Sequence, residues 1–200
     1  MIKNDKGLLL VISGPSGTGK GTVCKRLLEK NKDIFLSVSA TTRKPREGEI
    51  DGVSYHFYDE DKFRNLIAKN QFIEWAAFCD NYYGTPKAPV VENIENGRDV
   101  MLEIEIEGAM KVRAKHPEGV YIFLFPPSLE VLEERLKGRG TETDEVIAKR
   151  LARAKEEFKM CTKYNYYVVN DDLEKAVEEI EAIIVAEKAR KERNQVNLEF

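Results

Sequence analysis

The chain has 200 residues, of which 42% are hydrophobic, and it contains no apolar run of the roughly 18 residues that a membrane-spanning helix needs. Its 32 Lys and Arg nearly balance its 35 Asp and Glu, so no overall positive field attracts nucleic acid or an anionic membrane. We therefore expect a soluble, cytoplasmic, single-domain protein whose partners are small molecules and include neither nucleic acid nor membrane, with a homo-oligomer left open.

The first expected element is a buried strand that leads into a glycine-rich loop. Residues Gly7 to Ile12, GLLLVI, form a short apolar run typical of a parallel sheet. The loop GPSGTGKGT follows at Gly14 to Thr22, and apolar residues at helical spacing then predict a helix from about Lys20 to Lys30. A strand, a glycine-rich loop and a helix in this order predict a site for the phosphates of a nucleoside triphosphate.

The chemistry of this loop depends on its glycines and its lysine. Glycines let successive backbone N–H groups turn toward phosphate oxygens, the helix N-terminus adds partial positive charge, and Lys20 reaches the outer phosphates. The predicted phosphate-binding residues are Gly14, Pro15, Ser16, Gly17, Thr18, Gly19, Lys20, Gly21 and Thr22. The usual motif has Ser or Thr directly after the lysine to bind Mg²⁺, whereas this chain has Gly21 and then Thr22. Either Thr22 binds the metal, or phosphates and water hold it.

The segment from about Leu36 to Ala88 departs from the pattern that precedes it. Short alternating apolar runs are separated by turn signals, which predicts an inserted subdomain with its own small sheet. Two arginines, Arg43 and Arg46, and two tyrosines, Tyr55 and Tyr83, occur in it. Guanidinium groups bind phosphate through two hydrogen bonds and phenols donate one each, so these side chains suit one further phosphate.

Strands and helices alternate in the rest of the chain. Further strands are expected at Val100–Ile106, Val120–Phe125 and Tyr166–Val169, and helices at Asp59–Asn70, Ala88–Asn96, Leu129–Lys137, Asp144 to about Lys163 and Leu173 to about Arg193. This alternation predicts an α/β fold with a mostly parallel sheet. The charged residues at the end of the chain are expected to be frayed.

Two polar segments in the second half are candidates for chemistry. On the expected strand VMLEIEIEG, Glu103, Glu105 and Glu107 recur every second residue and would share one face, where they need cations, metal-bound water or solvent. The segment KGRGTETD places glycines and cations between two helices, as a mobile flap would. Arg139 in this flap and Arg150 beyond it could close over phosphates and exclude water.

Several motifs in order resemble the guanylate kinase family: the phosphate loop, SVSATTRKPREGEIDGVSYHF, FIEWAAF, NYYGT, GRGTET and VVNDDL. The resemblance implies a three-layer P-loop α/β fold with a GMP-binding insert at about 36–88, a lid at about 137–156 and a core formed by 1–35, 89–136 and 157–200. It also implies transfer of the γ-phosphoryl group of ATP to GMP with Mg²⁺, giving ADP and GDP.

The resemblance assigns roles to individual residues. Ser39, Glu74 and Thr85 would read the guanine; Arg43, Arg46, Tyr55 and Tyr83 would hold the GMP phosphate; Asn170 and Asp171 would lie on the adenine side; and Lys20, Arg43, Arg139 and Arg150 would supply catalytic charge. Glu105 stands where the family usually has Asp, so its contacts in the GMP site stay open. Two alternatives are a kinase for another monophosphate and a non-catalytic guanylate-kinase-like interaction domain, which would be expected to lack an intact phosphate loop.

Overall fold

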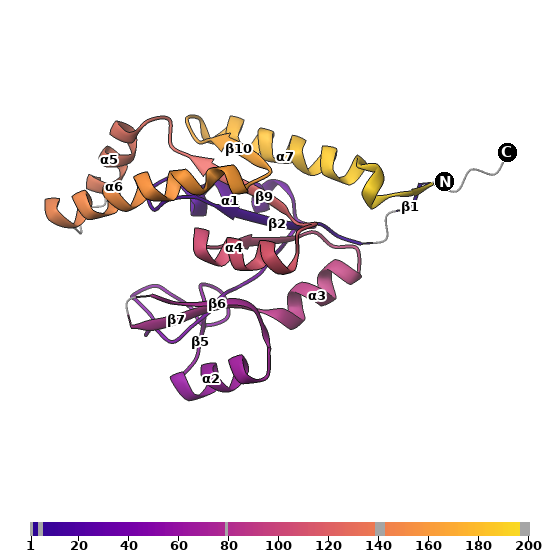
Figure 1. Cartoon of the computed structure of the whole chain (residues 1–200), viewed down its shortest axis with the longest axis horizontal. Helices are drawn as coiled ribbons and strands as arrows, with labels where there is room; N and C mark the ends of the chain where they lie inside the picture. The colour runs from indigo at the N-terminus through magenta and orange to yellow at the C-terminus, as the bar shows by residue number, and fades with distance from the viewer. Residues whose placement is uncertain (1, 4–5, 79, 139–142, 197–200) are drawn as a thin grey trace.

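The computed structural model describes residues 2–3, 6–78, 80–138 and 143–196. Figure 1 shows a central sheet between layers of helices, a second smaller sheet beside α4, and the pair α5 and α6 at the end remote from the two termini. Among the described residues, no helix combines the length and apolar character needed to cross a membrane.

The central sheet has five strands, and every pairing in it is parallel. Its order is β10-β9-β2-β8-β3, with β2 at Leu9–Ser13, β3 at Phe35–Leu36, β8 at Val100–Glu103, β9 at Val120–Phe125 and β10 at Tyr166–Val169. Strands β2 and β9 are buried on both faces, which is why they read as continuous apolar runs. The expected α/β fold with a mostly parallel sheet is confirmed.

Helices cover both faces of this sheet and make three layers. On one face lie α1, Lys20–Lys30, and α7, Leu173–Ala189, which pack on β2 and β9 through Leu27 and Ile180. On the other face lie α3, Lys87–Glu95, and α4, Ile106–Lys115, which pack around Phe123. Two separate apolar clusters therefore fix the sheet between the helical layers.

A second sheet lies in the segment that the sequence sets apart. Its order is β5-β4-β7-β6, with β4 at Ala40–Thr41, β5 at His56–Phe57, β6 at Phe72–Phe78 and β7 at Asn81–Pro86. Helix α2, Glu60–Ala68, is capped by Asp59 and packs on this sheet through Phe63, whose ring stacks on Phe72 at 4.5 Å. This small core is separate from the two clusters of the central sheet.

Helices α5, Leu129–Lys137, and α6, Asp144–Phe158, form a hairpin with a small apolar core of its own. The helix expected to run to about Lys163 ends at Phe158 and continues as the 3₁₀ helix η1, Lys159–Lys163. The flap residue Arg139 lies outside the described residues.

The strand expected at Val100–Ile106 is wrong in its second half. Strand β8 ends at Glu103, Glu105 occupies the cap position of α4, and the helix starts at Ile106. The alternating pattern continues past the end of the strand, but the buried residues Ile106, Ala109 and Val112 follow helical spacing. A parallel connection from β8 to β9 also needs a crossover, which α4 supplies. Glu103, Glu105 and Glu107 therefore do not share one strand face.

Residues 190–196, part of the charged segment expected to be frayed, are more ordered than predicted. Helix α7 stops at Ala189, and the 3₁₀ helix η2, Lys191–Arg193, follows. Strand β11, Gln195–Val196, pairs antiparallel with β1, Ile2–Lys3. The buried carboxylate of Glu187 accepts from Arg190 at 3.1 Å and from Arg193 at 2.9 Å. These ion pairs hold a segment whose charge alone suggested fraying.

Candidate active site

The phosphate loop joins β2 to α1 with two of its glycines in conformations that other residues adopt poorly. Gly17 and Gly19 have φ values of 94° and 89°, in the left-handed region. A Cβ atom at Gly14 would lie 2.4 Å from the carbonyl oxygen of Leu124. The Lys20 Nζ folds back over the loop and donates to the carbonyl oxygen of Gly14 at 2.5 Å. The N-terminus of α1 and this ammonium group are thus placed to meet an anion.

Side chains from three segments hold the loop in shape. The Thr18 hydroxyl donates to the carbonyl oxygen of Pro15 at 2.9 Å, and Asn170 Nδ2 donates to the carbonyl oxygen of Thr18 at 2.8 Å. Arg135 in turn donates to the carbonyl oxygen of Asn170 at 2.9 Å. Both Thr18 and Asn170 are buried, so their side chains stabilise the loop itself.

A smaller hollow opens on this side of the loop. It is lined by Gly17, Gly19, Thr22, Arg135, Asn170, Asp171 and Leu173. Thr22 and Asp171 are both exposed there. Thr22, whose role as a metal ligand is open, and Asp171, which is expected on the adenine side, therefore line one hollow beside the phosphate loop.

A cavity of about 510 Å³ lies between the carboxyl end of the central sheet and the second sheet. The predicted site residues that line it are Lys20, Ser39, Arg43, Arg46, Tyr55, Glu74, Tyr83 and Glu105. Thr85 is linked to this cavity through Glu74, to which its hydroxyl donates at 2.7 Å. Residues from the phosphate loop and from the second sheet thus face one space, which we call the central cavity.

Glu74 on β6 is the buried acid of the central cavity. Glu74 is only 6% exposed, and its Oε1 accepts the hydrogen bond from the Thr85 hydroxyl. Burial raises the pKa of Glu74, while the Thr85 hydrogen bond and the charge of Lys111 oppose that rise. A carboxylate kept in such a place favours a ligand that brings hydrogen-bond donors to it.

Glu49 orients the Arg43 side chain and holds the backbone at Arg46. Arg43 donates to its two carboxylate oxygens at 3.0 and 2.8 Å, and the backbone N–H of Arg46 donates at 2.7 Å. These bonds hold the pKa of Glu49 below its usual range. The Arg43 guanidinium also lies 5.5 Å from the centre of the Tyr55 ring, which meets the Tyr83 ring edge to face at 6.1 Å. Two cations and two phenols are thereby gathered on one wall.

Helix α6 contributes two cations to neighbouring parts of the site. Arg150 Nη1 donates to the Ser16 hydroxyl of the phosphate loop at 3.2 Å. Arg153, one turn further along α6, lines the central cavity, and its Nη2 lies 3.6 Å from Glu105 Oε2. Residues three apart on a helix share a face, so α6 contacts both the phosphate loop and the central cavity.

Glu103 lies at the junction of these two parts. It ends β8, lines the central cavity, and its Oε1 would be 3.6 Å from a Cβ atom at Gly21. Burial raises the pKa of Glu103, while the charge of Lys20 opposes the rise. Gly21, which follows the loop lysine, has no side chain, and the Glu103 carboxylate lies beside it.

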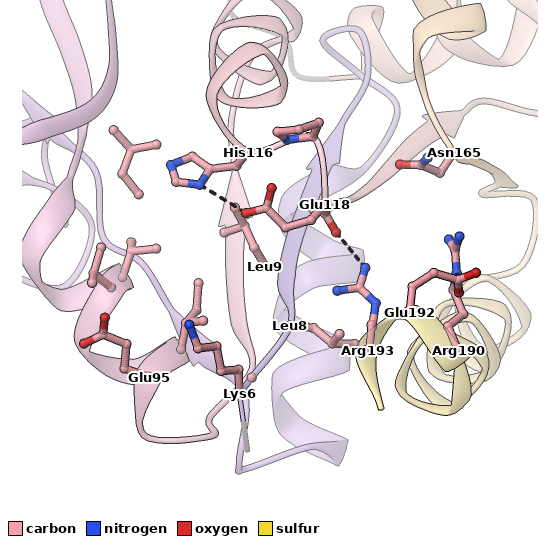
Figure 2. A pocket seen from close by; sticks show the side chains of 17 residues that line it. Lys6, Leu8, Leu9, Glu95, His116, Glu118, Asn165, Arg190, Glu192 and Arg193 are labelled. Carbon is pink, nitrogen blue, oxygen red and sulfur yellow. Dashed lines mark hydrogen bonds and ion pairs between the residues drawn. The ribbon is translucent and has the colours of Figure 1, made fainter. Parts of the chain in front are cut away.

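A second large cavity, of about 570 Å³, lies at the opposite end of the central sheet. Figure 2 shows its charged residues, several of which pair with each other: His116 lies 3.3 Å from Glu118, and Arg193 donates to the carbonyl oxygen of Glu118 at 2.6 Å. Its floor includes Leu8 and Leu9, where β2 begins. Open α/β sheets bind ligands at the carboxyl ends of their strands, so the central cavity is the candidate active site.

The family model described as guanylate kinase matches residues 6–187. The chain belongs to the guanylate kinase family. It is 58% identical to a guanylate kinase of Caldanaerobacter subterraneus subsp. tengcongensis over 95% of this chain and 92% of the relative. A guanylate kinase of Clostridium perfringens strain SM101 is 54% identical, with coverage of 98% and 91%. The crystal structure of guanylate kinase from Anaplasma phagocytophilum matches with a TM-score of 0.80 at 36% identity, covering 97% of this chain and 92% of that one.

Within this guanylate kinase fold, three residues that contact predicted site residues had no role in the sequence interpretation. Gly108, Glu49 and Arg153 all line the central cavity. Glu49 belongs to the motif PREGE, and its position three residues after Arg46 was the available signal. Arg153 lies three residues after Arg150 and so could have been placed on the same helical face. Nothing in the sequence indicated which wall Gly108 faces.

Proposed function

We propose that the chain transfers the γ-phosphoryl group of ATP to GMP and forms ADP and GDP. The observation that carries this proposal is the position of Lys20, which belongs to the phosphate loop and also lines the central cavity with Arg43 and Glu74. An ATP held by the loop then presents its γ-phosphate to a second nucleotide in that cavity. Bringing the two reactants together in this way is the main requirement of phosphoryl transfer.

Glu74 gives the cavity its preference for guanine. The Watson–Crick edge of guanine carries an N1–H and an N2–H₂ donor beside the O6 acceptor, so one carboxylate accepts two hydrogen bonds. The Ser39 hydroxyl is available to donate to O6, and Thr85 holds the carboxylate in place at 2.7 Å. Adenine would bring an acceptor at N1 to the same carboxylate. Polar sites of this kind discriminate by on the order of 10⁴-fold, because the wrong base leaves buried groups unpaired.

The phosphate of GMP binds at the wall formed by Arg43, Arg46, Tyr55 and Tyr83. Arg43 is already fixed by Glu49, which limits the freedom that its guanidinium loses when phosphate binds. Guanidinium groups neutralise the dianion and the two phenols each donate one hydrogen bond. This binding directs a phosphate oxygen of GMP toward the phosphate loop.

In the transfer step, that phosphate oxygen forms a bond to the γ-phosphorus while the bond from the γ-phosphorus to the bridging oxygen breaks and ADP leaves. Lys20 and Arg43 both line the central cavity, and Arg150 reaches the phosphate loop from α6. Arg139 joins them as a further predicted cation of the lid, which we place at about 137–156. Their charges offset the negative charge on the transferring oxygens.

The residues beside Gly21 fit a hydrated Mg²⁺ that enters with ATP. Glu103 offers carboxylate oxygens next to Gly21 and Lys20, whereas Thr22 lines the separate hollow with Asp171. Among the described residues there is no group of three or more His, Cys, Asp or Glu able to enclose a metal. We therefore favour Mg²⁺ held by phosphates and water, with Glu103 accepting from that water. When bound, Mg²⁺ neutralises phosphate charge during transfer.

Two other functions are compatible with the fold, namely a kinase for another nucleoside monophosphate and a non-catalytic interaction domain. The intact phosphate loop with Lys20 favours catalysis, and Glu74 favours guanine. The test is ADP formation from ATP with GMP, AMP, dTMP or UMP as the acceptor, with and without Mg²⁺. We expect turnover with GMP that depends on Mg²⁺. Faster turnover with another monophosphate, or none with any, would contradict the proposal.

A further inference from the structure

Gly108 is a buried glycine in the first turn of α4, where a helix would normally prefer another residue. Glycine weakens a helix because it loses more backbone freedom than alanine does when the helix forms. Its conformation does not require glycine, because its φ is not among the positive ones. The reason for glycine must therefore lie in what surrounds it.

The surrounding atoms leave no room for a side chain. A Cβ atom built at Gly108 would lie 2.9 Å from Glu74 Oε2 and 3.3 Å from Glu74 Cδ. The next neighbour, Ile104 Cδ1, would be at 3.6 Å, an ordinary van der Waals distance. A side chain at position 108 would thus clash only with the Glu74 carboxylate. Because this carboxylate is the end of a side chain, it can move without a change in the backbone.

Glu74 cannot avoid this conflict and keep its place. Its Oε1 accepts from Thr85 at 2.7 Å and its residue is 6% exposed, so the carboxylate has one supported position. In that position Oε2 lies against the first turn of α4, where the partial positive charge of the helix N-terminus favours a negative group. Lys111, one turn further along α4, also favours the charged form.

We propose that Gly108 is a positioning residue for guanine recognition, because the absence of a side chain lets the Glu74 carboxylate lie against α4 in the orientation that accepts from the base. The inference rests on the proposed function, in which Glu74 reads guanine. A methyl group at position 108 displaces the carboxylate toward the central cavity. The fold tolerates this change because only a side-chain end moves, but the hydrogen bonds to guanine are misdirected.

A comparison of the wild-type chain with three variants tests this inference: Gly108→Ala, Glu74→Asp and the double variant. We expect Gly108→Ala to raise the GMP KM by about tenfold or more, the effect of losing one hydrogen bond to a charged group. The ATP KM should stay within about twofold, because the phosphate loop is not touched. The thermal midpoint should not fall, since alanine is the better helix former.

The Glu74→Asp background separates a clash with the carboxylate from other effects. Aspartate is one methylene shorter, so its carboxylate no longer reaches the methyl group at position 108. There the added Gly108→Ala change should alter the GMP dissociation constant, measured by calorimetry, by less than about twofold. The same fold-change in the GMP dissociation constant in both backgrounds would overturn the inference, as would an unchanged GMP KM in Gly108→Ala alone.

A parallel loss of ATP affinity and thermal midpoint in Gly108→Ala would also overturn it, because Gly108 would then be a packing residue. Wild-type turnover keeps the two proposals apart. If the wild-type chain does not phosphorylate GMP, the proposed function fails whatever the variants do. If it does, the variants test Gly108 alone.

Discussion

In the proposed function guanine selection depends on Glu74, and removing the charge of this residue gives a direct prediction. In Glu74→Gln, one of the two acceptors becomes an NH₂ donor that faces a donor of guanine. We expect the GMP KM to rise about a hundredfold, with the ATP KM within about twofold. Steady-state kinetics with each substrate varied in turn measure both. Glu107→Gln is the matched control, because Glu107 lines the same cavity but pairs with Lys111 at 2.8 Å. Equal changes for ATP and GMP would argue against base reading.

The raised pKa of Glu74 predicts how pH acts on GMP binding. Burial lifts this pKa above the usual glutamate value of about 4.3, so the free protein takes up a proton here at a higher pH than an exposed glutamate would. Because the folded protein binds this proton more tightly than the unfolded chain does, protonation of Glu74 stabilises the fold at low pH. This stabilisation is lost as pH rises through the pKa of Glu74 in the folded protein. Guanine needs the ionised form, so GMP affinity should weaken as pH falls through that pKa.

Calorimetric titration of GMP across the acidic range checks this expectation. The phosphate of GMP also titrates, and Glu74→Gln keeps that contribution while removing the carboxyl group. We expect a steeper acidic loss of affinity in the wild-type chain than in the variant. Identical pH profiles would show that Glu74 does not control binding.

At the scale of elements, the phosphate loop depends on one lysine. Lys20 Nζ donates to carbonyl oxygens of its own loop, and in the proposed function it exchanges those bonds for bonds to phosphate oxygens of ATP. We expect Lys20→Met to lower kcat by at least about a hundredfold. Lys25→Met, an exposed change on the same helix, is the control and should keep kcat. Retained turnover in Lys20→Met would remove the loop from the mechanism.

We expect helix α6 to affect GMP binding in the central cavity through the ion pair of Arg153 with Glu105. Their atoms lie 3.6 Å apart and both side chains are at least half exposed, so the pair is worth at most about 1 kcal/mol, or fivefold. We predict that Glu105→Gln and Arg153→Gln each lower kcat/KM for GMP by up to about fivefold and that the double variant falls no further. Fully additive losses would mean that the two residues act separately.

Two elements mark the limit of what the sequence could predict. The phosphate loop was predictable because its glycines, lysine and flanking periodicities are local signals. The start of α4 was not, because Ile104 and Ile106 continue the alternation of β8 while the helix follows from the need to cross to β9. The positions of Glu103 and Gly108 beside Gly21 and Glu74 depend on that start. Their roles therefore appear only in three dimensions.

At the scale of the whole molecule, the central cavity joins parts of the chain that are far apart in sequence. Lys20 comes from the core, Glu74 from the second sheet and Arg153 from α6. The alternation of strands and helices predicted the layered core, and most of the residues that the family motifs assign to GMP line the central cavity. The sequence did not predict that α6 contacts both the phosphate loop and the central cavity, because the position of α6 depends on its packing against α5.

The central claim is that both nucleotides meet in this one cavity and that phosphate passes directly between them. The most direct test uses ATP labelled in its γ-phosphate, with GMP and Mg²⁺, and follows the label over time. The account predicts that the label appears in GDP with one ADP formed for each GDP, and that Glu74→Gln suppresses this at low GMP concentration. Label released as inorganic phosphate at a rate unaffected by GMP would contradict the account.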